Sequence, residues 1–206
     1  SAVFTVGVRL NWLAENPIIA GGLSGDVTKA ATRSSNARNV RRDYTPDELK
    51  KIFSSPIFDG SGWKPPRAEF GEAWLWLPLL MYYTGARREE LAQLKAREVI
   101  VDEGKPPHLD IMTSTADGDT RGVKNDGSRR LIPLHPALID RGFLRYVETV
   151  RSADGQLFPK LKTNHAGYYG ANFGKRWAIY LRDVVELDTT VPPAHGFRHT
   201  FKTLCR

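Results

Sequence analysis

Three short segments of the chain place cationic side chains where they could hold a phosphate. The first, residues 84–91, reads TGARREEL. Gly85 allows a sharp turn between two helices, and Arg87 and Glu90, three positions apart, share one helix face. An arginine at a helix start, close to free backbone N–H groups, suits an anion. The same residues are also typical of a surface Arg–Glu pair, which contributes little to stability.

The second segment, residues 123–130, reads VKNDGSRR. Asp126-Gly127 predicts a hairpin turn before a strand. Lys124 precedes this turn and Arg129 follows it, so the hairpin could present an ammonium to a phosphate. An exposed, solubilising turn would have the same composition, and the segment alone leaves both interpretations open.

The third segment, residues 195–202, reads HGFRHTFK. On a helix, one stripe carries apolar side chains that we expect in the core, namely Phe197, Phe201 and Leu204. On the far side, His195, Arg198 and Lys202 fall within an arc of roughly 60°. A histidine beside an arginine could act as an acid or base next to an oxyanion clamp, or it could belong to a solvated face.

Several other kinds of chemistry have no support in the sequence. Five histidines and one cysteine make no paired metal-ligand spacing, and no glutamate follows His195 as it would in a zinc protease. The phosphate-binding GxxxxGK[ST] loop, the GxGxxG fingerprint and the GxSxG nucleophile elbow are all missing. We therefore expect no metal and no cofactor.

Composition describes a basic globular chain. The 206 residues include 30 Lys+Arg against 23 Asp+Glu, a net charge of +7, and 41% are hydrophobic. A single cysteine suits a reducing compartment, and the longest apolar run, residues 73–83, is short of the roughly 20 residues that cross a bilayer. No signal peptide opens the chain. We expect a soluble, cytoplasmic protein, and the positive charge favours a nucleic-acid partner only weakly.

Patterning divides the chain into three parts. Residues 1–20 have a crude helical spacing, residues 21–43 look like a basic linker, and residues 44–206 form the main domain. Its start is marked by Thr45 and Glu48, which predict a capping box. We expect helices over residues 46–54, 69–83, 88–95, 136–151, 168–185 and 194–205, and strands over residues 98–101, 109–113 and 129–134. This is a mostly helical α+β fold with a small antiparallel three-stranded sheet.

Taken together and in this order, the three segments resemble the catalytic domain of the tyrosine recombinases, or phage integrases. The resemblance covers residues 44–206, and the segment ending at residues 12–17 looks like the last helix of that family's core-binding domain. It implies an integrase-like fold in which Arg87 is the first catalytic arginine and Glu90 supports it. It also implies that Lys124 is the hairpin lysine and that His195 and Arg198 form the HxxR pair.

The family's activity is site-specific DNA recombination and integration through a 3′-phosphotyrosine intermediate. Two guanidiniums would clamp the phosphate, a lysine would protonate the departing 5′-oxygen, and a histidine would take the nucleophile's proton. The implied partner is double-stranded DNA, on which the full-length enzyme is a tetramer, with no membrane involved. The further cations that we expect on the DNA are Arg41, Arg42, Arg129, Lys175, Arg176 and Lys202.

One departure from the family's pattern limits the expected activity. The family's nucleophilic tyrosine follows HxxR, whereas all seven tyrosines of this chain precede it. We therefore expect a fragment or truncated form that binds DNA without cleaving it and that is a monomer, or a weak dimer, in solution without DNA. Two alternatives stay open: a type IB topoisomerase-like enzyme, and a non-catalytic DNA-binding protein derived from an integrase.

Overall fold

The computed structural model describes residues 43–62, 69–111, 130–151 and 155–206. These residues belong to the second of two units into which the chain divides, Arg42–Arg206. The helix expected in residues 1–20, the linker up to residue 42 and the turn at residues 126–127 lie outside the described residues.

Helix α4, Pro46–Phe53, begins where the capping box predicts. The Thr45 hydroxyl accepts from the Glu48 N–H at 3.2 Å, and the Thr45 N–H donates to the Glu48 carboxylate at 2.7 Å. Proline at the first helical position needs no N–H partner there. Local chemistry alone therefore fixes this helix start.

Helix α5, Ala73–Thr84, is buried along most of its length. It begins four residues later than the predicted residue 69, because Gly71 has a φ of +50°, which a right-handed helix does not admit. It ends at Gly85, whose φ of +60° is the left-handed conformation that closes many helices.

The sheet is three-stranded and antiparallel, as predicted, and its strand order is β1-β2-β3. Short helices α6 (Arg88–Ala92) and η1 (Ala96–Glu98) lead into β1 (Val99–Ile100), and β2 (His108–Ile111) pairs with β3 (Arg130–Pro133). Leu109 and Ile111 on β2 are buried, whereas Leu131 on the edge strand β3 is exposed. The sheet thus buries one face only, as antiparallel sheets commonly do.

The C-terminal half is helical. The helix predicted over residues 136–151 is two helices, α7 (Pro136–Asp140) and α8 (Phe143–Val150). Gly142 separates them because its φ of +91° interrupts the helical backbone. Helices α9 (Gly170–Asp183) and α10 (His195–Leu204) follow.

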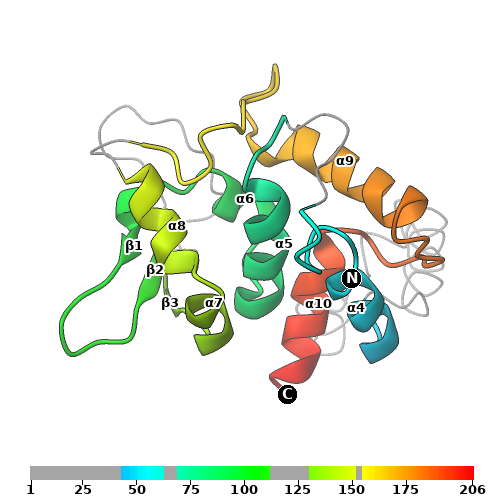
Figure 1. The fold of residues 1–206 in the computed structure, drawn as a ribbon, viewed down its shortest axis with the longest axis horizontal. Helices are drawn as coiled ribbons and strands as arrows, with labels where there is room; N and C mark the ends of the chain where they lie inside the picture. Colours follow the sequence, from blue (N-terminus) through cyan, green and yellow to red (C-terminus); the bar gives the residue numbers. More distant parts are fainter. Residues whose placement is uncertain (1–42, 63–68, 112–129, 152–154) are drawn as a thin grey trace, which may run out of the picture. The chain divides into compact units, whose positions relative to one another are not determined.

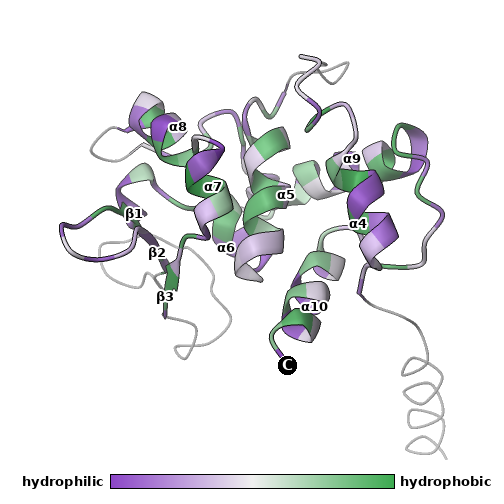
Figure 2. Cartoon of the chain, turned by 60° about the horizontal axis from the view of Figure 1, so that its bottom comes forward, coloured by the Kyte–Doolittle hydropathy of each residue, from purple (hydrophilic) through white to green (hydrophobic). Residues whose placement is uncertain are grey.

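Helix α5 lies at the centre of the domain (Figure 1). The sheet lies to one side of it with α7 and α8, and α4, α9 and α10 lie to the other. Apolar residues concentrate on α5 (Figure 2). An aromatic cluster joins α9 to α10 and to the start of α4, with Trp177 and Tyr44 each contacting Phe197.

Helix α10 is held in place at both its start and its middle. Tyr44 donates its N–H to the Thr200 hydroxyl at 2.8 Å and its O–H to the Pro193 carbonyl at 2.8 Å. Phe197 is fully buried, as predicted, but Leu204 is 67% exposed, so the predicted apolar stripe does not extend to the end of the helix. The core contacts stop about one turn before Leu204, where Phe201 is only half-buried.

Candidate functional site

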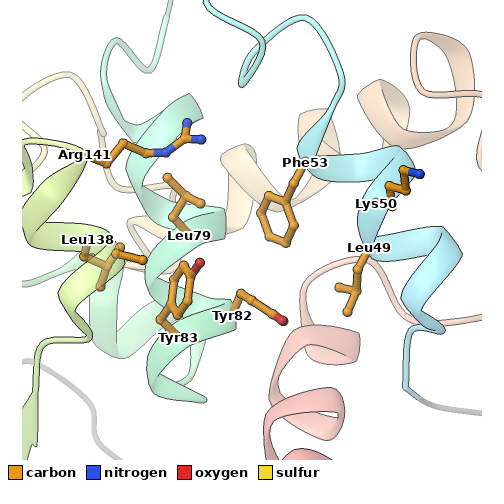
Figure 3. A pocket seen from close by; sticks show the side chains of 9 residues that line it. Leu49, Lys50, Phe53, Leu79, Tyr82, Tyr83, Leu138 and Arg141 are labelled. Carbon is orange, nitrogen blue, oxygen red and sulfur yellow. The ribbon is translucent and has the colours of Figure 1, made fainter.

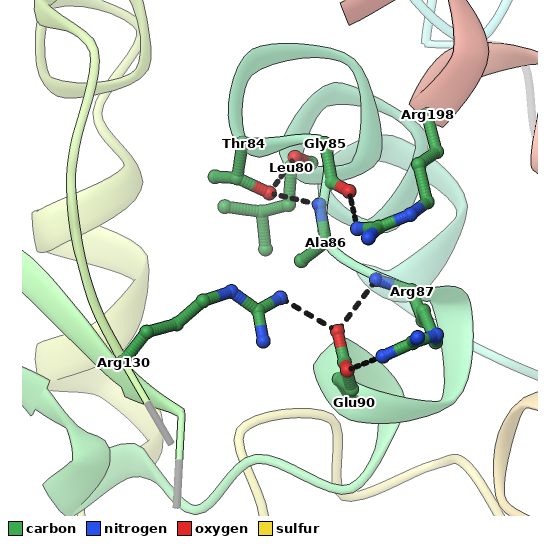
Figure 4. Close-up of polar contacts among 8 residues, drawn as sticks. All are labelled: Leu80, Thr84, Gly85, Ala86, Arg87, Glu90, Arg130 and Arg198. Carbon is green, nitrogen blue, oxygen red and sulfur yellow. Dashed lines mark hydrogen bonds and ion pairs between the residues drawn. The ribbon is translucent and has the colours of Figure 1, made fainter. Parts of the chain in front are cut away.

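The turn between α5 and α6 is the platform of the candidate site (Figure 4). The Thr84 hydroxyl donates to the Leu80 carbonyl at 2.6 Å and accepts the Ala86 N–H at 3.1 Å. Together with the left-handed Gly85, these bonds turn the chain sharply, so that Arg87 emerges at the start of α6. The segment therefore forms the sharp turn between two helices that its glycine predicts.

Glu90 is the hub of the polar contacts at this corner. Its side chain is only 4% exposed. One carboxylate oxygen accepts the Arg87 backbone N–H at 2.8 Å and the Arg130 guanidinium at 2.8 Å, and the other accepts the Arg87 guanidinium at 2.7 Å. These hydrogen bonds outweigh the opposing effect of burial, so the pKa of Glu90 lies below its usual range.

Arg198 reaches the same turn from α10. Its guanidinium donates to the Gly85 carbonyl (Figure 4). Arg87 and Arg198 are 111 positions apart in the sequence, yet they occupy neighbouring places in the fold. Partial burial lowers the pKa of Arg198, and the positive charges of Arg87 and Arg130 lower it further. The cations are thus close enough to repel one another.

His195 begins α10, one turn before Arg198. Its ring centroid is 5.5 Å from that of His199. Partial burial lowers the pKa of His195, and the nearby charges of His199, Arg198 and Arg87 lower it further. The neutral imidazole is therefore favoured at neutral pH, which is the form that accepts a proton.

The arrangement is suited to a tetrahedral oxyanion. The guanidiniums of Arg87 and Arg198 differ in the charge of their partners. Arg87 is paired with the Glu90 carboxylate, whereas Arg198 is bonded to a neutral carbonyl. Planar guanidiniums form paired hydrogen bonds with phosphate oxygens. A concentration of like charge around a small volume also raises the local affinity for an anion.

The other sequence-predicted residues are distributed as follows. Lys124, Arg129, Arg41 and Arg42 lie outside the described residues. Lys175 is exposed and Arg176 half-buried on α9, and Lys202 is exposed on α10 one turn beyond Arg198. Of the site residues predicted from the sequence, the described part of the chain therefore brings together Arg87, Glu90, His195 and Arg198.

Sequence reasoning missed Arg130, which meets the hub carboxylate. The signal was present in the pair Arg129-Arg130, because successive side chains of a strand point to opposite faces. One of the two had to face the interior of the domain. Only the register of β3, in which Arg130 pairs with Ile111, decides which one does.

Sequence reasoning also missed the contacts between α6 and α9. Glu89 accepts the backbone N–H groups of Tyr169 and Gly170 at 2.6 and 2.9 Å, and so caps the start of α9. Arg88 lies against the same helix, where a Cβ added to Gly174 would come within 2.1 Å of its guanidinium nitrogen. Small residues on α9 thus permit the close approach that supports the site.

A separate groove of about 340 Å³ lies between α4, α5 and α7 (Figure 3). Its lining includes Phe53, Tyr82 and Leu138, with Lys50 on one side and Arg141 on the other. None of the proposed site residues lines it. Over the described ranges, no group of His, Cys, Asp and Glu could hold a metal, and no helix could span a membrane.

Comparison with known proteins identifies no relative. Scans of family models, of curated proteins and of solved structures each found no match to this chain.

Proposed function

We propose that residues 44–206 are the catalytic domain of a site-specific tyrosine recombinase, with an integrase-like fold that binds double-stranded DNA. The observation that carries the proposal is the meeting of Arg87 and Arg198 at the α5–α6 turn, with His195 one turn away on α10. Two arginines 111 positions apart have no structural need to adjoin each other. Their repulsion lowers stability, and the charge of Glu90 offsets it only in part.

Each residue of the site has a defined part in the proposed reaction. A tyrosine hydroxyl forms a bond to phosphorus, and the bond from phosphorus to the 5′-oxygen breaks. Arg87 and Arg198 stabilise the charge on the non-bridging oxygens, and His195 takes the tyrosine proton. Lys124, which only the family resemblance assigns, delivers a proton to the 5′-oxygen. All seven tyrosines precede the HxxR pair and none matches the family's nucleophile, so we expect this chain to bind DNA without cleaving it. Without DNA we expect a monomer or a weak dimer.

The binding step is tested by substituting the arginines one at a time. We expect Arg87→Ala and Arg198→Ala each to weaken binding to a labelled duplex about tenfold, since a charged hydrogen bond contributes ~1.5–3 kcal/mol. Fluorescence anisotropy measures the affinity. Arg151→Gln is the matched control, because Arg151 carries the same charge and pairs with Glu148 at 3.1 Å. Equal effects of all three substitutions would contradict a phosphate site at the α5–α6 turn.

The chemical step is tested by supplying a small nucleophile. Duplexes selected from a random pool for tight binding are incubated with alkaline hydrogen peroxide. The hydroperoxide anion bonds to phosphorus and the 5′-oxygen leaves with a proton, giving a 3′-peroxyphosphate and a 5′-hydroxyl end. We expect breaks at one position in the wild type and none in Arg198→Ala. Breaks without sequence preference would favour a type IB topoisomerase-like enzyme, and binding without breaks a non-catalytic protein.

A further inference from the structure

We infer that Arg130 is a positioning residue of the proposed phosphate site, which holds Arg87 in place through the carboxylate that the two arginines share. The inference rests on the proposed function, because it concerns how one of the phosphate-binding arginines is oriented. Arg130 comes from the sheet and Arg87 from the start of α6, so Glu90 links two elements that the sequence separates by 40 positions.

The contacts at Glu90 give the two arginines different tasks. The Arg130 guanidinium lies 2.8 Å from the same carboxylate oxygen that accepts the Arg87 backbone N–H. The second oxygen remains for the Arg87 guanidinium at 2.7 Å. Arg130 thus fixes the carboxylate plane from the sheet side. A fixed plane leaves the Arg87 guanidinium one orientation for its hydrogen bond to the second oxygen.

Arg87 is the most exposed of the three side chains and is therefore the one that can contact a ligand. The Arg87 side chain is 48% exposed, Arg130 is 32% exposed and Glu90 is 4% exposed. Arg87 can therefore keep its bond to Glu90 and present its remaining N–H groups to a phosphate. Arg130 approaches the carboxylate out of β3, from the side opposite to Arg87 (Figure 4).

The charge on Glu90 depends on these neighbours. Arg87 on its own helix and Arg130 on β3 both stabilise the carboxylate, and the charge of Arg198 on α10 interacts with it as well. Burial acts in the opposite direction. Removal of Arg130 takes away the strongest stabilising contact of the carboxylate and leaves the burial, so Glu90 takes up a proton at a higher pH than in the wild type. A protonated Glu90 no longer pairs with Arg87.

The test compares duplex affinity at two pH values by fluorescence anisotropy. We expect the ratio of wild-type to Arg130→Gln affinity to rise from about twofold at pH 8 to about tenfold near pH 4.3, the usual pKa of a glutamate, because Glu90 is protonated in the variant before it is protonated in the wild type. His195 titrates in both proteins, and the ratio removes its effect. Arg130→Lys keeps a cation near Glu90, so its affinity ratio should stay nearly constant with pH. Thermal unfolding of each variant establishes that it is folded.

Two further variants separate the possible failures. At the lower pH, Arg87→Ala should weaken the Arg130→Gln protein hardly at all, because Glu90 has already released Arg87. The positioning role is overturned if Arg130→Gln loses the same duplex affinity at both pH values. It is also overturned if this loss of affinity adds fully to the loss caused by Arg87→Ala. If Arg87→Ala alone leaves affinity unchanged, the proposed phosphate site itself is wrong. Arg151→Gln again controls for the loss of one charge.

Discussion

A single carboxylate organises the site at the scale of residues. An exposed Arg–Glu pair three positions apart on a helix contributes little, and the sequence alone favours that ordinary interpretation for Arg87 and Glu90. The structure differs because Glu90 is almost fully buried and accepts hydrogen bonds from two arginines. A buried carboxylate that loses its partners is strongly destabilising, so the three charges act as one unit.

Glu90→Gln should lower the free energy of unfolding at neutral pH by about 2 kcal/mol, because hydrogen bonds to a charged group are replaced by weaker ones. The pKa of Glu90 is lower in the folded protein than in the unfolded chain. The stabilisation is therefore fully present above the unfolded pKa of about 4.3 and is lost as the pH falls through the folded value.

Urea unfolding at neutral and acidic pH measures this effect. The wild type and Glu90→Gln should differ at neutral pH and converge in acid. Glu148→Gln is the control, since Glu148 is 65% exposed in its pair with Arg151 and its loss should change stability little at either pH. A difference for Glu90→Gln that persists unchanged in acid would contradict a contribution from its charge.

At the scale of elements, Gly85 joins the two helices that deliver the arginines. It ends α5 in the left-handed conformation, its carbonyl accepts from Arg198, and its Cα faces Phe201 of α10. A Cβ at this position would lie 2.4 Å from a ring carbon of Phe201. A side chain at Gly85 would therefore push α10 away from the turn.

Gly85→Ala should be destabilising for two reasons, backbone strain and the clash with Phe201. Gly142→Ala separates them, because Gly142 has a φ of +91° and no heavy atom within 4 Å of an added Cβ. We expect Gly142→Ala to cost about 1–2 kcal/mol from strain alone, and Gly85→Ala to cost about 1–3 kcal/mol more from overpacking. Chemical denaturation measures both.

The same comparison has a functional arm. Only Gly85→Ala should weaken duplex binding in the anisotropy assay, because only Gly85 sets the position of Arg198. If the two alanine variants had equal stability and equal affinity, Gly85 would have no role beyond ending its helix.

Local signals explain which elements the sequence could predict. The capping box at Thr45 identifies the start of α4, and the glycine after Thr84 identifies the end of α5, because both signals act within a few residues. The later start of α5 and the break at Gly142 depend on left-handed glycines, whose conformation no periodicity reveals. The partly exposed end of α10 depends on where the neighbouring core stops, which is a tertiary property.

The candidate site follows the same division between local and tertiary information. The pairing of Arg87 with Glu90 was predictable from their spacing, since residues three apart meet on a helix. The approach of Arg198 could be expected only from the resemblance to a family. The contact between Arg130 and Glu90 was not expected at all, because it depends on the register of β3 against β2.

At the scale of the whole molecule, the net charge of +7 gives the proposed DNA complex a measurable signature. Each phosphate that a cation neutralises releases counterions, so the logarithm of affinity falls linearly with the logarithm of salt concentration. If Arg87, Arg198 and three of the other proposed cations contact phosphates, the slope should be about −4.5. Arg87→Ala and Lys202→Ala should each reduce its magnitude by about one. Anisotropy titrations between about 50 and 200 mM salt measure the slope, and an affinity independent of salt would exclude a phosphate-binding surface.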